Sequence, residues 1–143
     1  MKKTYRKGIF VVVYRLEKSK DSIEYLILKR KLHWKGWEFC KGGIEPKEAL
    51  KKAALREVKE EVGLKPLNIK KHNKSGKYKY AKEFRDRPGI IGQTYVLFSS
   101  EVGQGNVKYN KKDHEHSDYK WCSFKQALKK LSYGNQRACL RVV

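Results

Sequence analysis

The chain has 143 residues, of which 35 are Lys or Arg and 15 are Asp or Glu, so its formal net charge is +20. Hydrophobic residues make up 39%, which is typical of a globular protein; with this length, it predicts one domain over residues 1–143 and excludes a disordered chain. The longest apolar run, residues 9–14, excludes a membrane span of ~20 residues, and no apolar signal-peptide region follows the basic N-terminus, so we expect a cytoplasmic protein without a membrane partner.

The first part of the chain predicts two β-strands, at residues 8–14 (GIFVVVY) and 24–29 (EYLILK), because both are rich in Val, Ile and Tyr. The polar segment between them, EKSKDS, predicts a hairpin-like turn. Residues 31–43 (KLHWKGWEFCKGG) then predict an aromatic loop that carries three glycines.

A helix is predicted next, from near Pro46, which is tolerated in a first helical turn, to Gly63, which suits a left-handed helix cap. Glu60 and Glu61 follow Glu57 by three and four residues. At about 100° per residue, this spacing brings the three carboxylates to one side of the helix. They border an apolar stripe that can pack on a sheet, made of Leu50, Ala54, Leu55, Val58 and Val62.

The rest of the chain predicts further strands and helices. In chain order they are a basic strand with a turn at 67–81, a loop at 84–92, a strand at 93–100, a strand at 119–123, a helix at 124–131 and a last helical turn at 135–140. Ser123 and Gln126 resemble a capping box at the start of the helix at 124–131. The interleaved elements indicate an α/β protein with a mixed sheet between helices.

The three glutamates predict a metal site. Crowded carboxylates repel one another unless a cation lies between them, and hard divalent ions such as Mg²⁺ or Mn²⁺ prefer oxygen ligands. The helix and the glycine loop before it therefore predict a metal platform for phosphate chemistry. For an isolated REVKEE segment, the alternative is a charged helix face paired with Lys and Arg. The three cysteines, Cys40, Cys122 and Cys139, are an odd number without a CxxC pair, which predicts buried thiols.

The segment from Gly42 to Leu64 resembles the Nudix box, G-x5-E-x7-R-E-U-x-E-E-x-G-U, where U is a bulky aliphatic residue. Every defined position matches: Gly42, Glu48, Arg56, Glu57, Val58, Glu60, Glu61, Gly63 and Leu64. The resemblance implies a Nudix hydrolase with the Nudix fold, an α/β/α sandwich, that uses Mg²⁺ to hydrolyse a nucleoside diphosphate linked to another group. It also implies that Glu57, Glu60 and Glu61 hold the metal, with the Gly42 carbonyl nearby. Arg56 and Glu48 would form a buried or half-buried pair that fixes the loop against the helix.

Two segments outside the box extend the resemblance. FCKGG resembles the FPKG segment of Nudix enzymes acting on dinucleoside polyphosphates, whose lysine, here Lys41, contacts phosphate; Cys40 replaces the usual proline. DHEHSDYKW resembles the E-H-x-x-Y/F-x-W pattern of asymmetrical diadenosine tetraphosphate hydrolases, which makes Glu115 a further metal ligand or a general base. His114 and His116 alone suggest zinc, but no third ligand has suitable spacing nearby. We expect His116 to orient this loop and Trp121 to lie in the core.

The resemblance also assigns substrate contacts. Tyr80 and Tyr133 match aromatic positions that hold an adenine from its two faces, and stacking is worth about 1–3 kcal/mol per base. That branch often has a lysine where Gln93 stands here, so we expect Arg85 or Arg87 to supply the positive charge. The pair Gly92–Gln93 is also similar to Nudix RNA 5′-pyrophosphohydrolases.

These observations predict Mg²⁺-dependent hydrolysis of diadenosine tetraphosphate to ATP and AMP, by a protein expected to be monomeric. The second hypothesis is removal of pyrophosphate from triphosphorylated RNA 5′ ends, because a net charge of +20 attracts any polyanion. A lysine-rich, solvated surface explains the same charge without a ligand. Other Nudix substrates, such as ADP-ribose or a nucleoside triphosphate, and a nucleotide- or RNA-binding module without activity, are the remaining alternatives.

Overall fold

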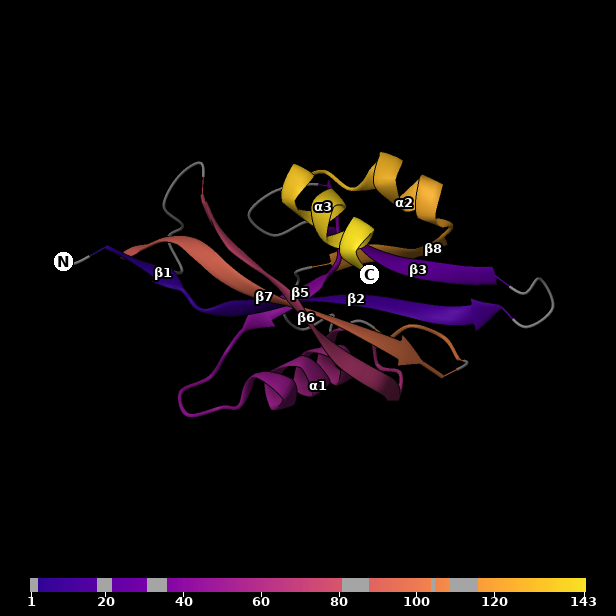
Figure 1. Cartoon of the computed structure of the whole chain (residues 1–143), viewed down its shortest axis with the longest axis horizontal. Coiled ribbons are helices and arrows are strands. Elements are labelled where there is room, and N and C mark those ends of the chain that lie inside the picture. Colours follow the sequence, from indigo (N-terminus) through magenta and orange to yellow (C-terminus); the bar gives the residue numbers. More distant parts are fainter. Residues whose placement is uncertain (1–2, 18–21, 31–35, 81–87, 104, 109–115) are drawn as a thin grey trace.

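A computed structural model of the chain describes residues 3–17, 22–30, 36–80, 88–103, 105–108 and 116–143. Eight strands and three helices lie in this described part. The strands form one sheet, with α1 (Leu50–Glu61) on one face and α2 (Phe124–Lys130) and α3 (Gly134–Val142) on the other (Figure 1). This arrangement confirms the predicted α/β fold with a sheet between helices. None of the described helices is long and apolar enough to cross a bilayer.

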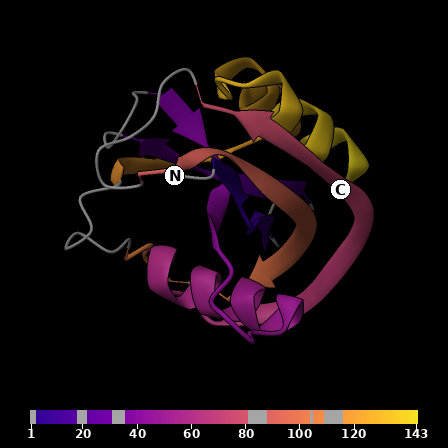
Figure 2. The same cartoon turned by 90° about the vertical axis from the view of Figure 1, so that its left-hand side faces the viewer.

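The sheet is mixed, as predicted. Its central order is β1-β7-β2-β3-β4, with β5 paired to β2, β6 to β7 and β8 to β3. β7 runs parallel to β1 and β2, and the other pairs between described strands are antiparallel. Figure 2 shows the two long paired strands β6 and β7 curving together. The strands are β1 Thr4–Arg6, β2 Gly8–Glu17, β3 Ser22–Arg30, β4 Gly36–Glu38, β5 Cys40–Gly43, β6 Pro66–Lys79, β7 Ile90–Val102 and β8 His116–Cys122.

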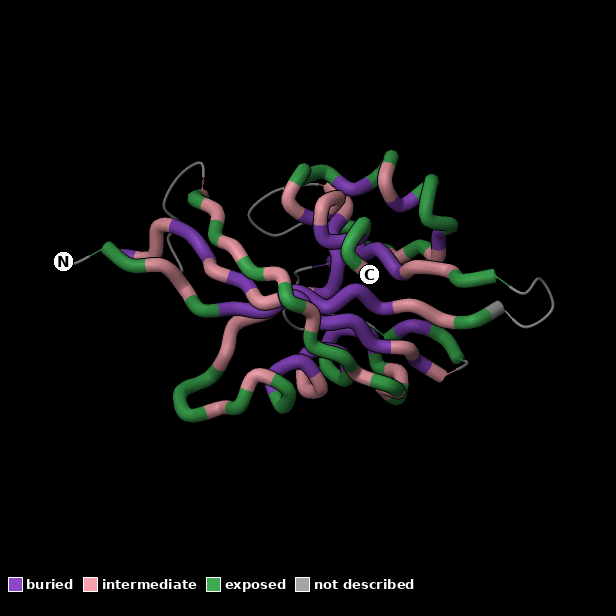
Figure 3. Tube along the Cα trace, in the orientation of Figure 1, coloured by how far each residue is buried: buried purple, intermediate pink, exposed green. Residues whose placement is uncertain are grey.

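Two apolar cores form because side chains alternate between the faces of each strand. On β2, Ile9, Val11 and Val13 pack with Ala54 and Val58 of α1. Phe10 and Val12 point the other way and pack with residues of α2 and α3, including Ala127 and Leu140. The buried colour of Figure 3 follows these central strands and the inner sides of the helices. Each fully buried large apolar side chain contributes about 1.5–3 kcal/mol, so the two cores hold the sheet rigidly behind the site.

The helix that carries the glutamates begins later than predicted, at Leu50 rather than near Pro46. Lys47 has φ 63°, a left-handed conformation that cannot continue a right-handed helix, and the Glu48 N–H bonds the Glu45 carbonyl across a turn (3.0 Å). Residues 45–48 therefore form a turn. The end was predicted correctly, because Gly63 has φ 72° and its N–H bonds back to Val58 and Lys59.

Three loop and strand predictions were wrong in detail. The predicted loop at 31–43 contains two short strands, β4 and β5, which pair with β3 and β2. The basic segment expected to hold a strand and a turn is one continuous strand, Pro66–Lys79, and the loop expected up to Gly92 enters β7 at Ile90. β1 was not predicted. The capping box of Ser123 and Gln126 is confirmed, and the last helical turn is a full helix, Gly134–Val142.

Candidate active site

Arg56 ties the glycine loop to helix α1. Its Nε and Nη2 donate to the two oxygens of Glu48, each at 2.9 Å, and Nη2 also donates to the Gly43 carbonyl at 2.8 Å. Its Nη1 donates to Glu57 Oε1 at 2.7 Å and reaches Glu60 at 3.4 Å. We call Arg56, Glu48, Glu57 and the Gly43 carbonyl the Arg56 clamp. Hydrogen bonds to Arg56 hold the pKa of Glu48 down at about 2.

The Glu57 carboxyl is buried under the loop. A Cβ added at Gly42 would fall onto this carboxyl, so only glycine leaves room for it. Burial, together with the negative charges of Glu61 and Glu60, raises the pKa of Glu57 to about 8, despite the opposing charge of Arg56. Glu61 is also buried, whereas Glu60 is about half-exposed. The expectation that all three carboxylates border the apolar stripe was wrong for Glu57 and Glu61, which turn inward with Ala53, Ala54 and Val58.

A second charged cluster lies deeper in the fold. Glu38, on β4, is fully buried; its Oε2 lies 3.4 Å from Arg30 Nη1 and 3.6 Å from His116 Nε2, and its Oε1 lies 3.7 Å from Lys41 Nζ. His116 Nδ1 contacts Glu61 Oε2 at 3.1 Å. We call Glu38, Arg30, His116 and Lys41 the Glu38 bridge. It joins strands β3, β4, β5 and β8, and through His116 it reaches helix α1.

Contacts within the Glu38 bridge, and with Glu61, favour the charged forms of Glu38 and His116. Burial alone raises the pKa of Glu38, but the charge of Lys41, the nearby His116 ring and the charge of Arg30 outweigh it and leave the pKa below its usual value. Burial likewise acts to lower the pKa of His116, but its contacts with Glu38 and Glu61 raise it to about 9. An imidazolium therefore stands between two carboxylates near neutral pH.

Lys41 connects this bridge to a group of tyrosines. Its Nζ donates to the Tyr78 hydroxyl at 3.2 Å, and the Tyr78 ring lies 6.0 Å from that of Tyr80. Burial lowers the pKa of Lys41, and the electrostatic effects of Glu38, Tyr80 and Tyr133 oppose that change. Tyr133, the N-cap residue of α3, is 47% exposed. Tyr80 approaches Gln93 with its hydroxyl at 3.5 Å.

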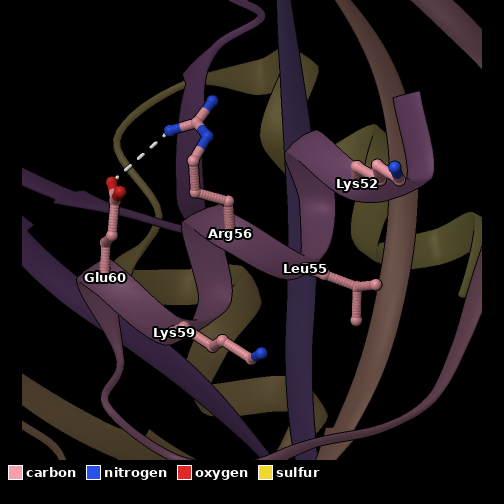
Figure 4. Close-up of a pocket in the computed structure, with 5 residues that line it drawn as sticks. All are labelled: Lys52, Leu55, Arg56, Lys59 and Glu60. Atoms are coloured by element: carbon pink, nitrogen blue, oxygen red, sulfur yellow. Dashed lines mark hydrogen bonds and ion pairs between the residues drawn. The ribbon is translucent and has the colours of Figure 1, made fainter. Parts of the chain in front are cut away.

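A shallow hollow of about 360 Å³ lies on the outer side of α1, next to the Arg56 clamp. Its lining is Lys52, Leu55, Arg56, Lys59 and Glu60 (Figure 4). Leu55, which was expected in the apolar stripe, lines this hollow, whereas Ala53 takes a place in the core instead. Glu60 thus stands at the boundary between the carboxylate cluster and solvent.

The structure places several of the predicted site residues. Glu48 and Arg56 form a half-buried pair, as the resemblance implied, and Lys41, next to the glycine pair on β5, donates to the Tyr78 hydroxyl. Glu115, Arg85 and Arg87 lie outside the described residues. Trp121 is half-buried against the core, with the Arg15 guanidinium 4.1 Å above its ring. Glu38, Arg30 and Tyr78 were not among the residues predicted from the sequence.

The three helix glutamates have the type of donor atom that a divalent cation prefers. Among the described residues, however, no three His, Cys, Asp or Glu side chains are arranged so that they could hold a metal ion together. Glu57, Glu60 and Glu61 offer hard oxygen ligands, and they are close enough to repel one another. Burial and this repulsion raise the pKa of the Glu57 carboxyl, so a nearby positive charge would stabilise its ionised form. Arg56, which contacts Glu57 and Glu60, supplies that charge in the structure.

Comparisons with known proteins agree on one family. The NUDIX domain family matches residues 4–141. The asymmetrical bis(5′-nucleosyl)-tetraphosphatase of Caenorhabditis elegans is 29% identical over 140 residues, which cover 94% of this chain and 91% of that protein. An RNA pyrophosphohydrolase of a Nitratiruptor species is 27% identical over 135 residues, which cover 92% of this chain and 86% of that protein. The crystal structure of a C. elegans Ap4A hydrolase binary complex matches with a TM-score of 0.72 and 25% identity, over 95% of this chain and 93% of that chain.

Proposed function

This chain belongs to the NUDIX domain family, and from that membership we propose that it hydrolyses diadenosine tetraphosphate to ATP and AMP, with Mg²⁺ as its cofactor and Mn²⁺ as a substitute. Membership supports the broader activity, a Nudix hydrolase of nucleoside polyphosphates. The observation that carries the proposal is the sequence of contacts along β5. Lys41 donates to the Tyr78 hydroxyl, the adjacent Gly42 makes room for the Glu57 carboxyl, and the carbonyl of Gly43 accepts from Arg56.

In this proposal, some residues bind the cation and the phosphates, and others orient the substrate. Glu57, Glu60 and Glu61 hold the cation, with the Gly42 carbonyl and Glu115 as further ligands or, for Glu115, as the general base. A bound divalent cation supplies charge neutralisation and a more acidic water. Lys41 binds a bridging phosphate and stabilises the negative charge that grows as water attacks phosphorus. Tyr80 and Tyr133 hold one adenine, which fixes the phosphate that is cut.

A panel assay tests this proposal. The protein is incubated with Mg²⁺ in ¹⁸O water and with diadenosine polyphosphates, ADP-ribose, NADH, mutagenic nucleoside triphosphates and triphosphorylated RNA. We expect the highest kcat/KM for diadenosine tetraphosphate, with ATP and AMP as products and the label in one of them. A higher value for any other member of the panel would reject the tetraphosphate as the preferred substrate.

RNA 5′ ends are the second candidate, favoured by one feature of the structure. Strand β6 carries Lys70, Lys71, Lys74, Lys77 and Lys79 and no acidic residue, and most of these lysines are exposed. Such a strand attracts a long polyanion more strongly than a short one. RNA of increasing length separates the candidates, because the second predicts that kcat/KM rises with length and falls steeply with salt. Values independent of length would exclude a role for the RNA body.

A further inference from the structure

The Glu38 bridge buries more charge than packing requires. Glu38, Arg30 and His116 are each at most 4% exposed, although they belong to three different strands. Buried ion pairs seldom stabilise a fold more than apolar side chains of the same volume would. Within the described part of the chain, Glu38 Oε1 and His116 Nε2 also have no hydrogen-bond partner. Stability alone therefore does not account for these residues, and their position between two parts of the site suggests another role.

The contacts of the bridge lead to both halves of the proposed chemistry. On one side, His116 Nδ1 lies 3.1 Å from Glu61 Oε2, on α1. On the other, Glu38 Oε1 lies 3.7 Å from the ammonium of Lys41, on β5. The two sides meet where His116 Nε2 lies 3.6 Å from Glu38 Oε2. Arg30 Nη1 lies 3.4 Å from the same Glu38 oxygen, Oε2.

We propose that His116 is a positioning residue that holds the Glu61 carboxylate, and that Glu38 connects this contact to Lys41. The inference rests on the proposed function, because it takes Glu61 as a metal ligand and Lys41 as a phosphate contact. A carboxylate on a long side chain has several rotamers, so a buried hydrogen bond that selects one of them favours ion binding. Loss of such an outer contact typically weakens metal affinity about 10–100-fold.

Two isosteric variants separate the contacts of His116. The amide nitrogen of Asn takes the place of Nδ1, so His116→Asn keeps the donor to Glu61 and loses the contact with Glu38. The amide nitrogen of Gln takes the place of Nε2, so His116→Gln does the reverse. Both remove the ring from the same buried position, and Asn leaves one more methylene unfilled than Gln does. Thermal unfolding of each variant therefore measures its own loss of packing, and a loss of packing alone would weaken His116→Asn more than His116→Gln.

Binding of Mn²⁺ without substrate, measured by electron paramagnetic resonance of the free ion, is the readout. We expect His116→Gln to raise the Kd for Mn²⁺ by about tenfold or more, and His116→Asn to stay within about threefold of the wild type. Equal Kd values for the two variants, whether raised or unchanged, would overturn the inference. Absence of Mn²⁺ binding by the wild-type protein would refute the proposed function itself, and the role of Glu61 with it.

Glu38→Gln tests the second arm of the bridge in the same protein. It preserves the shape of the side chain and removes the charge that faces Lys41. We expect KM for diadenosine tetraphosphate to rise at saturating Mg²⁺, as the ammonium loses its partner, and the Kd for Mn²⁺ to stay within about threefold of the wild type, as in His116→Asn. The control is Glu24→Gln, which breaks the Arg15–Glu24 ion pair (3.0 Å) between β2 and β3. A Glu38→Gln variant with an unchanged KM would contradict the connection to Lys41.

Discussion

The Arg56 clamp and the Glu38 bridge each include a residue of β5, Gly43 and Lys41, and they bury charge in different ways. The clamp has one cation that donates to three acceptors at 2.7–2.9 Å, and those acceptors lie within 13 residues of Arg56 in the sequence. The bridge has several charged groups at 3.1–3.7 Å, drawn from residues as far apart as Arg30 and His116. The contacts of the clamp are therefore shorter. Those of the bridge are longer, and they reach the proposed metal ligand Glu61 on one side and the proposed phosphate contact Lys41 on the other.

This difference predicts that changes to the clamp and changes to the bridge affect protein stability and ligand binding to different extents. All the short hydrogen bonds of the clamp are donated by Arg56, so they are lost together when Arg56 is replaced. We therefore expect such a change to lower the stability of the glycine loop as well as the activity. The longer contacts of the bridge give less stability, so damage there should appear first in binding constants. Four perturbations test this contrast, in decreasing order of expected effect.

Arg56→Ala should have the largest effect. It leaves Glu48 and Glu57 without their cation, and breaking a buried pair on one side costs about 3–5 kcal/mol. We expect a lower free energy of unfolding in urea and a loss of turnover through altered loop geometry. Arg15→Ala is the matched control, because its partly exposed pair with Glu24 is worth about 0–1 kcal/mol. Normal metal binding and turnover in Arg56→Ala would show that the clamp is not needed.

Gly42→Ala should lower turnover with little loss of stability. The new Cβ falls onto the Glu57 carboxyl, which can rotate away, so the proposed ligand moves while the backbone stays. We expect kcat for diadenosine tetraphosphate to fall about a hundredfold, equivalent to about 2.7 kcal/mol. Gly103→Ala is the control, since no described atom lies within 4 Å of its added Cβ. Equal activity of the two variants would argue against a fixed place for Glu57.

Tyr133→Ala should act on substrate binding and leave the fold intact, because this side chain is about half-exposed. Loss of one stacking partner costs about 1–3 kcal/mol, which corresponds to a rise in KM of roughly 5–150-fold. Phe124→Ala removes another exposed aromatic ring, at the start of α2, and should leave KM unchanged. A Tyr133→Ala variant with wild-type KM would remove this residue from the adenine site.

Acid should produce the smallest effect, and it should act on the clamp. Hydrogen bonds to Arg56 place the pKa of Glu48 at about 2, below its usual 4.5. A lowered pKa stabilises the fold above pH 4.5, and this contribution is lost as the pH falls towards 2. The free energy of unfolding should therefore decline over that range, and the decline should be shallower in Glu48→Gln. Identical pH profiles would mean that the pair contributes nothing to acid stability.

The pattern of the sequence predicts the long elements, because they depend on near neighbours, whereas the pairing of Glu48 with Arg56 was expected from the resemblance to the Nudix box. The Val-rich β2 and the end of α1 at Gly63 follow from local spacing. The short strands β1 and β5 have too few residues to show periodicity, so their pairing with distant strands could not be read. The start of α1 was misplaced, since proline suits either a turn or a first helical turn.

The Glu38 bridge could not be predicted for the same reason. Its members are joined only when β3, β4, β5 and β8 come together, and isolated charges in a chain with 35 basic residues give no local signal. The inward turn of Glu57 and Glu61 was likewise hidden, because a helical pattern treats glutamate as a surface residue. His116 could be singled out from its motif, but its partners Glu38 and Glu61 could not.

The most direct test of the central claim compares Glu60→Gln with Glu45→Gln in Mg²⁺-dependent hydrolysis of diadenosine tetraphosphate. Both glutamates are largely solvent-accessible and lie 3.4 and 3.9 Å from Arg56, but only Glu60 is a proposed metal ligand. The account predicts that Glu60→Gln folds normally and loses activity by about two orders of magnitude or more, whereas Glu45→Gln keeps wild-type rates. A fully active Glu60→Gln, or equal losses in the two variants, would contradict it.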